Sequence, residues 1–215
     1  MKKYYTLIYL ILIVALSSSC VENKSIEKEI TKAEMVITSI TDTLKFTSGI
    51  RVIFQDSKGN YWFGSHKEGV CRFDGKSFQY FTTNEGLSHN QIHTIQEDKN
   101  GVIWFGSQNG VNSFDGITIK SHMATVNETS QSQWKKAETD LWFHDGNKEG
   151  VYKNDRQKLT YLAFPNPKSI NPNNLYAVTG ISKGKNGMLW MATYAGVFGY
   201  NGQDFTIIND ETLGL

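Results

Sequence analysis

Proline and cysteine are both scarce in this chain, which has 3 Pro and 2 Cys among 215 residues. All three prolines fall within a single stretch, residues 165–172, so the rest of the chain contains no residue that blocks backbone hydrogen bonding. Aromatic residues make up 13% of the sequence, and there are 19 Gly. This composition favours an all-β repeat protein and argues against a disordered chain.

We expect no internal disulfide between the two cysteines. Cys20 follows an export-like segment and is a candidate for lipid attachment, which would leave Cys71 without a partner. Cys71 stands between Val70 and Arg72 in an expected strand, where a small buried residue is the ordinary interpretation. A catalytic thiol would need a nearby histidine, and the sequence places none beside it.

The chain also lacks an excess of either charge, with a formal net charge of +1. Removing residues 1–19 takes away Lys2 and Lys3, so 20 basic residues remain against 21 acidic ones and the net charge becomes −1. A near-neutral protein gives no electrostatic reason to expect nucleic acid as a partner. It also has no polybasic patch that would attract anionic lipid.

Motifs that carry chemistry are missing too. The sequence has no nucleophile elbow, phosphate-binding loop or zinc-protease motif. The five histidines are scattered, with His89 and His93 four residues apart in a linker rather than on a helix. We therefore expect no catalytic set, no metal site and no cofactor.

The N-terminal 19 residues are expected to be an export signal. Lys2 and Lys3 precede the apolar run Tyr4–Leu16, which is short for a membrane span, and Ser17–Ser19 leads to Cys20. The pattern resembles a bacterial lipoprotein signal, although Ser17 stands where Leu is usual. The alternatives are an ordinary secretory signal cut near Ser19 and an uncut anchor. The resemblance implies lipid attachment at Cys20 and a place in the cell envelope, on the periplasmic or surface side.

The dominant feature of the remaining chain is a sequence motif that occurs four times. It is clearest over Asp98–Gly116, and it occurs earlier over Asp56–Gly75 and later over Gly184–Gly202. A weaker copy spans Asp140–Asp155. Four copies with a period of about forty residues indicate a repeat architecture.

One copy predicts four short antiparallel strands. In the second copy the strands are expected over 92–97, 102–107, 111–114 and 117–120, separated by turns rich in Asp, Asn and Gly. Such a sheet is the unit of a β-propeller blade, and blades bury their faces against one another. A Trp recurs at one equivalent position in all four copies, and we expect it to pack between blades rather than to stack on a ligand. These residues are Trp62, Trp104, Trp142 and Trp190.

These patterns divide the chain as follows. A signal peptide (1–19) and a tether (20–34) precede N-terminal edge strands (35–49), expected over 35–40 and 44–46 and suited to covering a blade edge. The propeller repeats occupy 50–215. Their boundaries are 50–90, 91–126, 127–174 and 175–215.

The third repeat is degenerate. Its hairpin has Asn154-Asp155-Arg156 in place of Asp-Gly, and it ends in the long loop Pro165–Asn174. Insertions of this kind in repeat proteins gather on one face, which is often the binding face, but a tolerated surface insertion is an equal alternative. Four blades could form a closed ring, an open array or the front of a longer propeller, and an open array would favour self-association through blade edges.

The pattern over Asn90–Gly116 combines Glu-Asp, Trp-Phe-Gly and Phe-Asp-Gly at fixed spacing, and it resembles the two-component regulator propeller repeat. The resemblance implies an all-β, propeller-like array of four-stranded antiparallel blades and a non-catalytic sensor module for a small ligand or glycan. Signal output would then require a partner envelope protein. The alternatives are a protein-interaction scaffold and, less favoured, a propeller lyase or hydrolase of the streptogramin lyase type.

Polar side chains that do not repeat between the copies are the candidates for ligand binding. Five of them follow the Trp strand in the first and third copies, and they are also the residues to test for catalysis. They are His66, Lys67, Glu68, His144 and Asp145.

Overall fold

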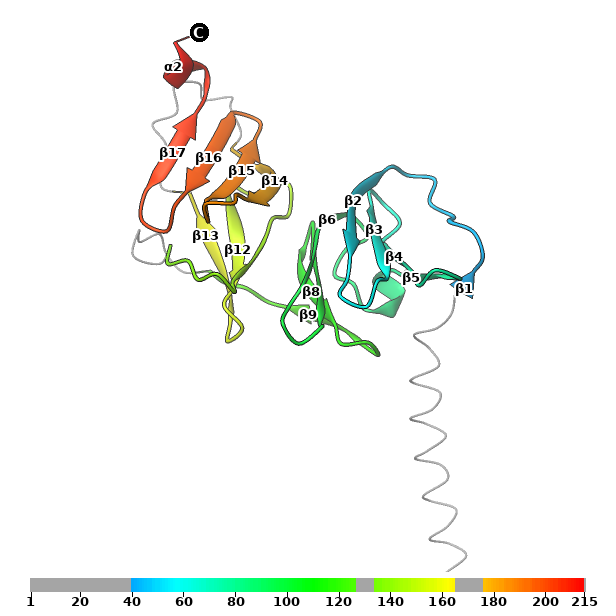
Figure 1. Cartoon of the computed structure of the whole chain (residues 1–215). Helices are drawn as coiled ribbons and strands as arrows, with labels where there is room; N and C mark the ends of the chain where they lie inside the picture. Colours follow the sequence, from blue (N-terminus) through cyan, green and yellow to red (C-terminus); the bar gives the residue numbers. More distant parts are fainter. Residues whose placement is uncertain (1–39, 127–133, 165–175, 215) are drawn as a thin grey trace, which may run out of the picture. The chain divides into compact units, whose positions relative to one another are not determined.

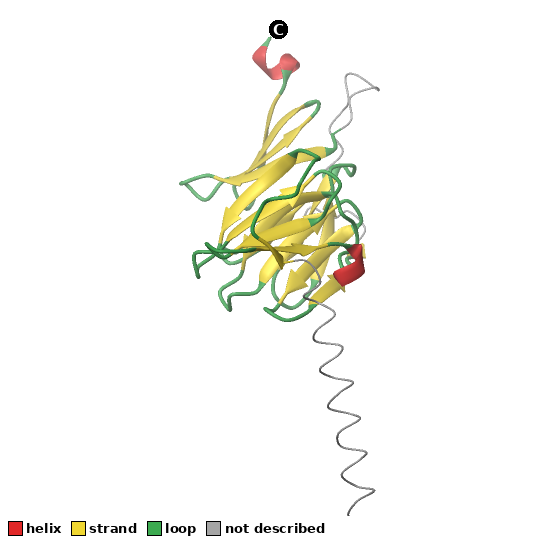
Figure 2. Ribbon diagram, turned by 90° about the vertical axis from the view of Figure 1, so that its right-hand side faces the viewer, coloured by secondary structure: helices red, strands yellow, loops and turns green. Residues whose placement is uncertain are grey.

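The computed structural model describes residues 40–126, 134–164 and 176–214. The described chain is built almost entirely of strands joined by short loops (Figures 1 and 2). The strands form four separate sheets that follow one another along the sequence, and the antiparallel strands β2–β5, β6–β9, β11–β13 and β14–β17 of each sheet come from one repeat. The prediction of an all-β array of antiparallel blades is therefore confirmed.

Three blades have four consecutive antiparallel strands in simple up-and-down order. The first blade contains β2 (Ile50–Gln55), β3 (Tyr61–Ser65), β4 (Val70–Phe73) and β5 (Phe78–Phe81). The second contains β6 (Ile92–Glu97), β7 (Ile103–Ser107), β8 (Gly110–Phe114) and β9 (Ile119–His122). The fourth contains β14 (Val178–Lys183), β15 (Leu189–Thr193), β16 (Gly196–Tyr200) and β17 (Phe205–Ile208). Among the described residues, no strand pairing joins the fourth blade to the first and closes a ring.

The third blade is built differently. Its antiparallel strands are β11 (Leu141–Phe143), β12 (Gly150–Asn154) and β13 (Leu159–Ala163). The short β10 (Thr125–Val126) adds to β13 in parallel, at the opposite edge from β11. In the part of the chain that the structure describes, β11 has no partner on its other side, where the other blades carry their first strand.

An N-terminal segment covers the outer edge of the first blade. Ile40 and Thr41 form β1, which pairs antiparallel with β5. Glu68 holds the following residues, because its carboxylate accepts hydrogen bonds from the backbone and hydroxyl groups of Thr47 and Ser48 at 2.6–3.2 Å. The residues 44–46, expected as a strand, are irregular.

The turn between the first two strands of a blade is closed by an aspartate. Asp56 accepts from the backbone of Lys58 and Asn60 and from the indole Nε1 of Trp62, the last at 2.8 Å. Asp98 repeats the arrangement in the second blade, with Trp104 Nε1 at 3.1 Å. The carboxylate therefore shapes the turn, and it also accepts a hydrogen bond from the indole N–H, which packing would otherwise bury without a partner.

Aromatic residues fill the spaces between neighbouring blades. Trp62 packs against Phe105 and Phe114 of the second blade, with ring centroids 5.6 and 5.7 Å apart. Trp104 contacts Phe143 of the third blade at 6.4 Å, and Trp142 belongs to the core shared by the third and fourth blades. The expected packing role is confirmed for these three tryptophans. Trp190 is half-buried and lies over Gly199 of its own sheet.

Two short helical turns complete the described fold. A 3-10 turn, Thr83–Glu85, begins at Thr82 with a capping box and links the first blade to the second. The helix α2 (Asp210–Leu213) follows β17. None of the helices in the described part of the chain has the length and apolar character that crossing a bilayer requires.

Cys71 lies fully buried in β4, and burial raises the pKa of its thiol to about 12. A thiol with this pKa is protonated at neutral pH and is a poor nucleophile. The predicted signal peptide (1–19), lipid site Cys20, tether (20–34) and proline loop Pro165–Asn174 lie outside the described residues, as does the expected strand 35–40 except for Ile40.

Candidate functional site

The first strands of three blades share a β-bulge at the same place. The strand register skips one residue between Ile50 and Val52 in β2, and the same skip occurs in β6 and β14. The residue at each bulge stands eleven positions before the blade's tryptophan. These residues are Arg51, His93 and Thr179. A bulge leaves its residue out of the pairing ladder and redirects the side chain, and bulges often lie beside functional sites.

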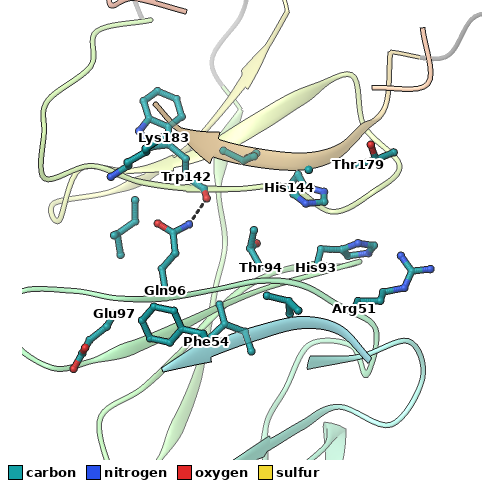
Figure 3. Close-up of a pocket in the computed structure, with 15 residues that line it drawn as sticks. Arg51, Phe54, His93, Thr94, Gln96, Glu97, Trp142, His144, Thr179 and Lys183 are labelled. Atoms are coloured by element: carbon teal, nitrogen blue, oxygen red, sulfur yellow. Dashed lines mark hydrogen bonds between the residues drawn. The ribbon is translucent and has the colours of Figure 1, made fainter. Parts of the chain in front are cut away.

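All three bulge residues line one pocket of about 480 Å³. The pocket is bounded by β2, β6 and β14, and the third blade contributes β11 and His144 directly after it. Figure 3 shows Arg51, His93, His144 and Thr179 gathered at one end, with Lys183, Gln96 and Trp142 at the other. Equivalent positions of three repeats thus meet in one cavity, because the first strands of the first, second and fourth blades face it.

His93 and His144 form a pair across the boundary between the second and third blades. Their ring centroids are 5.2 Å apart with the planes tilted by 54°. Burial lowers the pKa of both imidazoles to about 4, and the neighbouring His144 further lowers that of His93. Both rings are therefore neutral at pH 7, and each carries one N–H donor.

His144 is the more deeply placed of the two, with 2% of its surface exposed. Its Nδ1 atom is buried and has no hydrogen-bond partner among the described residues. The hydroxyl of Thr94 and the indole Nε1 of Trp142 are also buried without a hydrogen-bond partner among the described residues, and both residues line the pocket. Buried polar atoms are nearly always paired, so three unpaired ones around a cavity indicate that a ligand or water completes them.

Arg51 supplies the fixed positive charge at this end. Its side chain is exposed at the pocket and makes no hydrogen bond or ion pair with the other described residues. Its charge contributes, after burial, to the lowered pKa of His66, His93 and His144. The positive field of the guanidinium therefore reaches all three imidazoles.

The opposite end of the pocket is occupied by internal contacts. The amide Nε2 of Gln96 donates to the carbonyl of Trp142, and Lys183 Nζ donates to the carbonyl of Asp140 at 2.9 Å. Two side chains from neighbouring blades thus donate to carbonyls along the unpaired edge, one within β11 and one directly before it. Glu97 accepts from Ser57 of the first blade at 2.6–2.7 Å, so its carboxylate is also engaged.

The structure separates the five residues proposed from the sequence. His144 lines the pocket, whereas His66, with a buried and unpaired Nδ1, lies near it without lining it. Lys67 is exposed, and Glu68 is committed to the segment 47–48. Asp145 is buried and accepts from Lys148, from Asn147 and from the hydroxyl of Tyr152 at 3.0 Å.

Sequence reasoning passed over Arg51 and Thr179 and treated His93 only as one scattered histidine. The copies themselves contain the information that would have found them. When the copies are aligned on their tryptophans, the column eleven residues earlier reads Arg, His and Thr, between an apolar column of Ile, Ile and Val and a mixed column of Val, Thr and Gly. A polar column whose residue type varies between otherwise similar repeats is the pattern expected of a shared binding surface.

The described residues contain no group of three or more His, Cys, Asp or Glu side chains that could hold a metal ion. The Asp-rich turns at Asp56 and Asp98 point their carboxylates at their own backbone and tryptophan, as described above. The oxygen atoms of these turns are thereby accounted for by the turns themselves.

Comparison with known proteins identifies the repeats. The model of the two-component regulator propeller family matches residues 45–67 and 86–109. A segment of 43 residues is 44% identical to part of histidine kinase P4 of Formosa agariphila. This segment makes up 20% of this chain, and the match covers 3% of the kinase. The protein is a β-propeller-like repeat protein, and two segments within residues 45–109 match the two-component regulator propeller family.

Solved structures share the fold. Virginiamycin B lyase from Staphylococcus aureus, crystallised as a catalytically inactive variant with quinupristin, gives a TM-score of 0.57 at 18% identity, over 78% of this chain and 57% of the lyase. The extracellular domain assigned to a one-component system of B. thetaiotaomicron gives 0.56 at 22% identity, over 81% of this chain and 28% of that one. The extracellular domain assigned to a hybrid two-component system of the same species gives 0.54 at 21%, over 79% and 24%. This chain therefore spans little more than half the lyase and about a quarter of the two sensor domains.

Proposed function

We propose that the protein is a non-catalytic sensor module of the cell envelope that binds a small polar ligand in the pocket between its blades. The observation that carries the proposal is the convergence of the three bulge residues with His144 on one cavity. A packing role would place repeated apolar residues at equivalent positions, as it does for the tryptophans. Non-repeated polar residues at a re-aimed position are better explained by recognition.

The envelope location rests on two supports. The N-terminal sequence resembles a lipoprotein signal with Cys20 as the lipidated residue. The repeat family and the extracellular sensor domains of similar fold fit the same location. We propose that the ligand is a small molecule or glycan and that output passes to a partner envelope protein, with self-association through blade edges as the second route.

The proposal is tested by thermal unfolding of the full chain against a panel of neutral and acidic monosaccharides, disaccharides and short peptides. A ligand that binds only the folded state raises the melting temperature as its concentration rises above the dissociation constant. We expect at least one compound to stabilise the native chain and the His93→Gln variant to lose that response. His122→Gln is the matched control, because His122 lies on the outer strand β9.

A panel without any stabilising compound, combined with a stoichiometric protein that co-purifies, would instead favour an interaction scaffold. In that case the pocket residues would be dispensable for complex formation, and the blade rims would be the place to seek the interface.

A lyase activity is the second candidate, favoured by a histidine pair in the pocket of a fold shared with virginiamycin B lyase. Both imidazoles are unprotonated at neutral pH and can accept a proton, and substrate binding would have to raise their pKa from about 4 for efficient base catalysis. The test is consumption of quinupristin by the full chain, followed by mass spectrometry. Turnover that disappears in His144→Ala would establish the enzyme and overturn the non-catalytic proposal.

A further inference from the structure

We propose that the end of the pocket formed by Arg51, His93, His144 and Thr179, here called the oxyanion end, binds a compact oxyanion such as a carboxylate, sulfate or phosphate. This inference rests on the proposed function, because it names the chemical group by which the ligand is held. The four residues come from four different blades, three of them from equivalent bulges.

The charge at the oxyanion end is positive and unbalanced. Arg51 is a permanent cation, and no carboxylate of the described residues lies within ion-pair distance of it. The nearest acid to influence the histidine pair is Asp145. Its oxygens are already taken up by Tyr152 and by the backbone of the 145–148 turn. A lined cavity with an unpaired guanidinium is a site for an anion, since the guanidinium fork matches two oxygens at once.

The neighbouring imidazoles can add N–H donors, one from each neutral ring and two from a protonated one. The Thr179 hydroxyl lines the pocket but already donates its proton to the carbonyl of Ala192 at 3.2 Å. His144 brings a deeply buried ring whose Nδ1 is unpaired among the described residues. An oxyanion would accept from the guanidinium, and also from Nδ1 of this ring once the ring is protonated, because the neutral ring directs its one N–H to the Val178 backbone.

A cation is the less suitable occupant. Arg51 would repel it, and the described residues supply no set of three metal-binding side chains. An uncharged sugar would satisfy the hydrogen bonds but would leave the guanidinium charge uncompensated. Of the three ligand classes, cation, uncharged sugar and oxyanion, only the oxyanion both balances the positive charge and accepts hydrogen bonds from the donors.

Binding should strengthen as the pH falls from 7 to 5. The groups that face His93 and His144 are Arg51 and His66 of the first blade, Gln91 of the second blade, Asp145 of the third and the Val178 backbone of the fourth. A bound anion adds a negative charge to this set and raises the pKa of both imidazoles. Protonation and anion binding therefore favour each other, since the coupling between two ligands is reciprocal.

The experiment follows the imidazole resonances of the full chain labelled with 13C-histidine, assigned from the signals missing in His93→Gln and His144→Gln. Sodium phosphate, sodium sulfate and sodium glucuronate are titrated at constant ionic strength against sodium chloride, with glucose as the neutral counterpart of glucuronate. We expect saturable shifts of the His93 and His144 resonances with at least one oxyanion and none with chloride. Affinity should fall at least tenfold in Arg51→Gln and stay unchanged in Lys76→Gln, a loss of charge in an exposed turn of the same blade.

Each outcome bears on the inference in a definite way. Tighter binding of glucuronate than of phosphate and sulfate assigns the site to an organic carboxylate, and the reverse order assigns it to the free ions. An absence of saturable shifts, or a response equal in Arg51→Gln, overturns the inference. If a neutral sugar raises the melting temperature while no oxyanion shifts either histidine, the oxyanion inference fails and the proposed ligand-binding function stands.

Discussion

The imidazole rings of His93 and His144 lie with their centroids 5.2 Å apart, although His93 stands at the bulge in the first strand of the second blade and His144 follows β11 of the third. At this separation a proton on one ring raises the cost of a proton on the other. The two histidines therefore titrate as a pair, and apparent pKa values belong to the pair.

The histidine pair should make the fold sensitive to mild acid. The pKa of each ring is about 4 in the folded state against an ordinary value of 6.5, so the unfolded chain binds more protons between these values. Stability is then complete above pH 6.5 and is lost as the pH falls towards 4. For the buried His144 alone the loss is on the order of 3 kcal/mol. Urea unfolding midpoints measured from pH 7 to 4 should fall less steeply in His144→Gln than in the native chain.

Glu68 provides a second pH window that can be separated from the first. Hydrogen bonds from Ser48, and then from Thr47, lower the pKa of its carboxyl to about 2 from 4.5, so its contribution is lost only as the pH falls through that range. Glu68→Gln should leave the slope between pH 6.5 and 5 unchanged and reduce the slope below 4.5. An altered slope above pH 5 in this variant would show that the two windows are not independent.

The aspartate that closes the first turn of a blade should stabilise the fold in proportion to how deeply its tryptophan is buried. Asp56→Ala removes the acceptor of the Trp62 indole, which is 1% exposed, and we expect a loss of about 2–3 kcal/mol because a buried donor is left unpaired. Asp98→Ala affects the half-buried Trp104 and should cost about half as much. Denaturant unfolding of both variants, with the exposed-turn Asp74→Ala as control, ranks their losses of unfolding free energy. Equal losses in all three variants would contradict the dependence on tryptophan burial.

The repeats made most of the fold predictable. A tryptophan at one position of each copy, with Asp-Gly turns at fixed distances, specifies where strands begin and end because each local preference agrees with the same blade. The pairing of Asp56 with Trp62 follows from that spacing once the turn is formed. The third copy is recognisably degenerate in sequence. Its parallel outer strand, β10, is not predicted by any sequence periodicity.

The site was less accessible to sequence reasoning because it depends on register. Alternation along 92–97 predicts a strand but assumes that every residue is paired, whereas the bulge removes His93 from the ladder. A bulge in a strand has no fixed sequence signature unless glycine is required. The convergence of Arg51 with His93 also depends on how blades pack, and only the comparison of equivalent positions brings these residues together.

Arg156 is expected to weaken the third blade at its last hairpin. It has a φ of 75°, and the equivalent turns of the other blades place Gly75, Gly116 and Gly202 in the same left-handed region. A side chain in that region costs about 1–2 kcal/mol, of which the greater freedom of unfolded glycine offsets about half. Arg156→Gly should therefore stabilise the protein by about 0.5–1 kcal/mol. Gly116→Arg should have the opposite effect in denaturant unfolding, and stabilisation by both changes would contradict the explanation.

Gly146 should control the position of His93 from the neighbouring blade. A Cβ atom at residue 146 would lie 2.5 Å from Cε1 of the His93 ring, so Gly146→Ala forces the ring away from its place beside His144. Gly187→Ala is a matched control, since its φ of 77° is close to the 80° of Gly146 and its Cβ would meet nothing nearer than the flexible Lys136 Nζ at 3.6 Å. Both variants bear a similar backbone cost, of about 1 kcal/mol.

The two variants should therefore differ in the site and not only in stability. We expect the His93 imidazole resonance to move, and its response to phosphate or glucuronate to weaken, in Gly146→Ala alone. The same loss in Gly187→Ala would mean that general loosening of the blades, rather than the placement of one ring, governs the pocket. A native response in both variants would show that the ring can shift without affecting recognition, which would place the anion nearer to Arg51 and His144 than to His93.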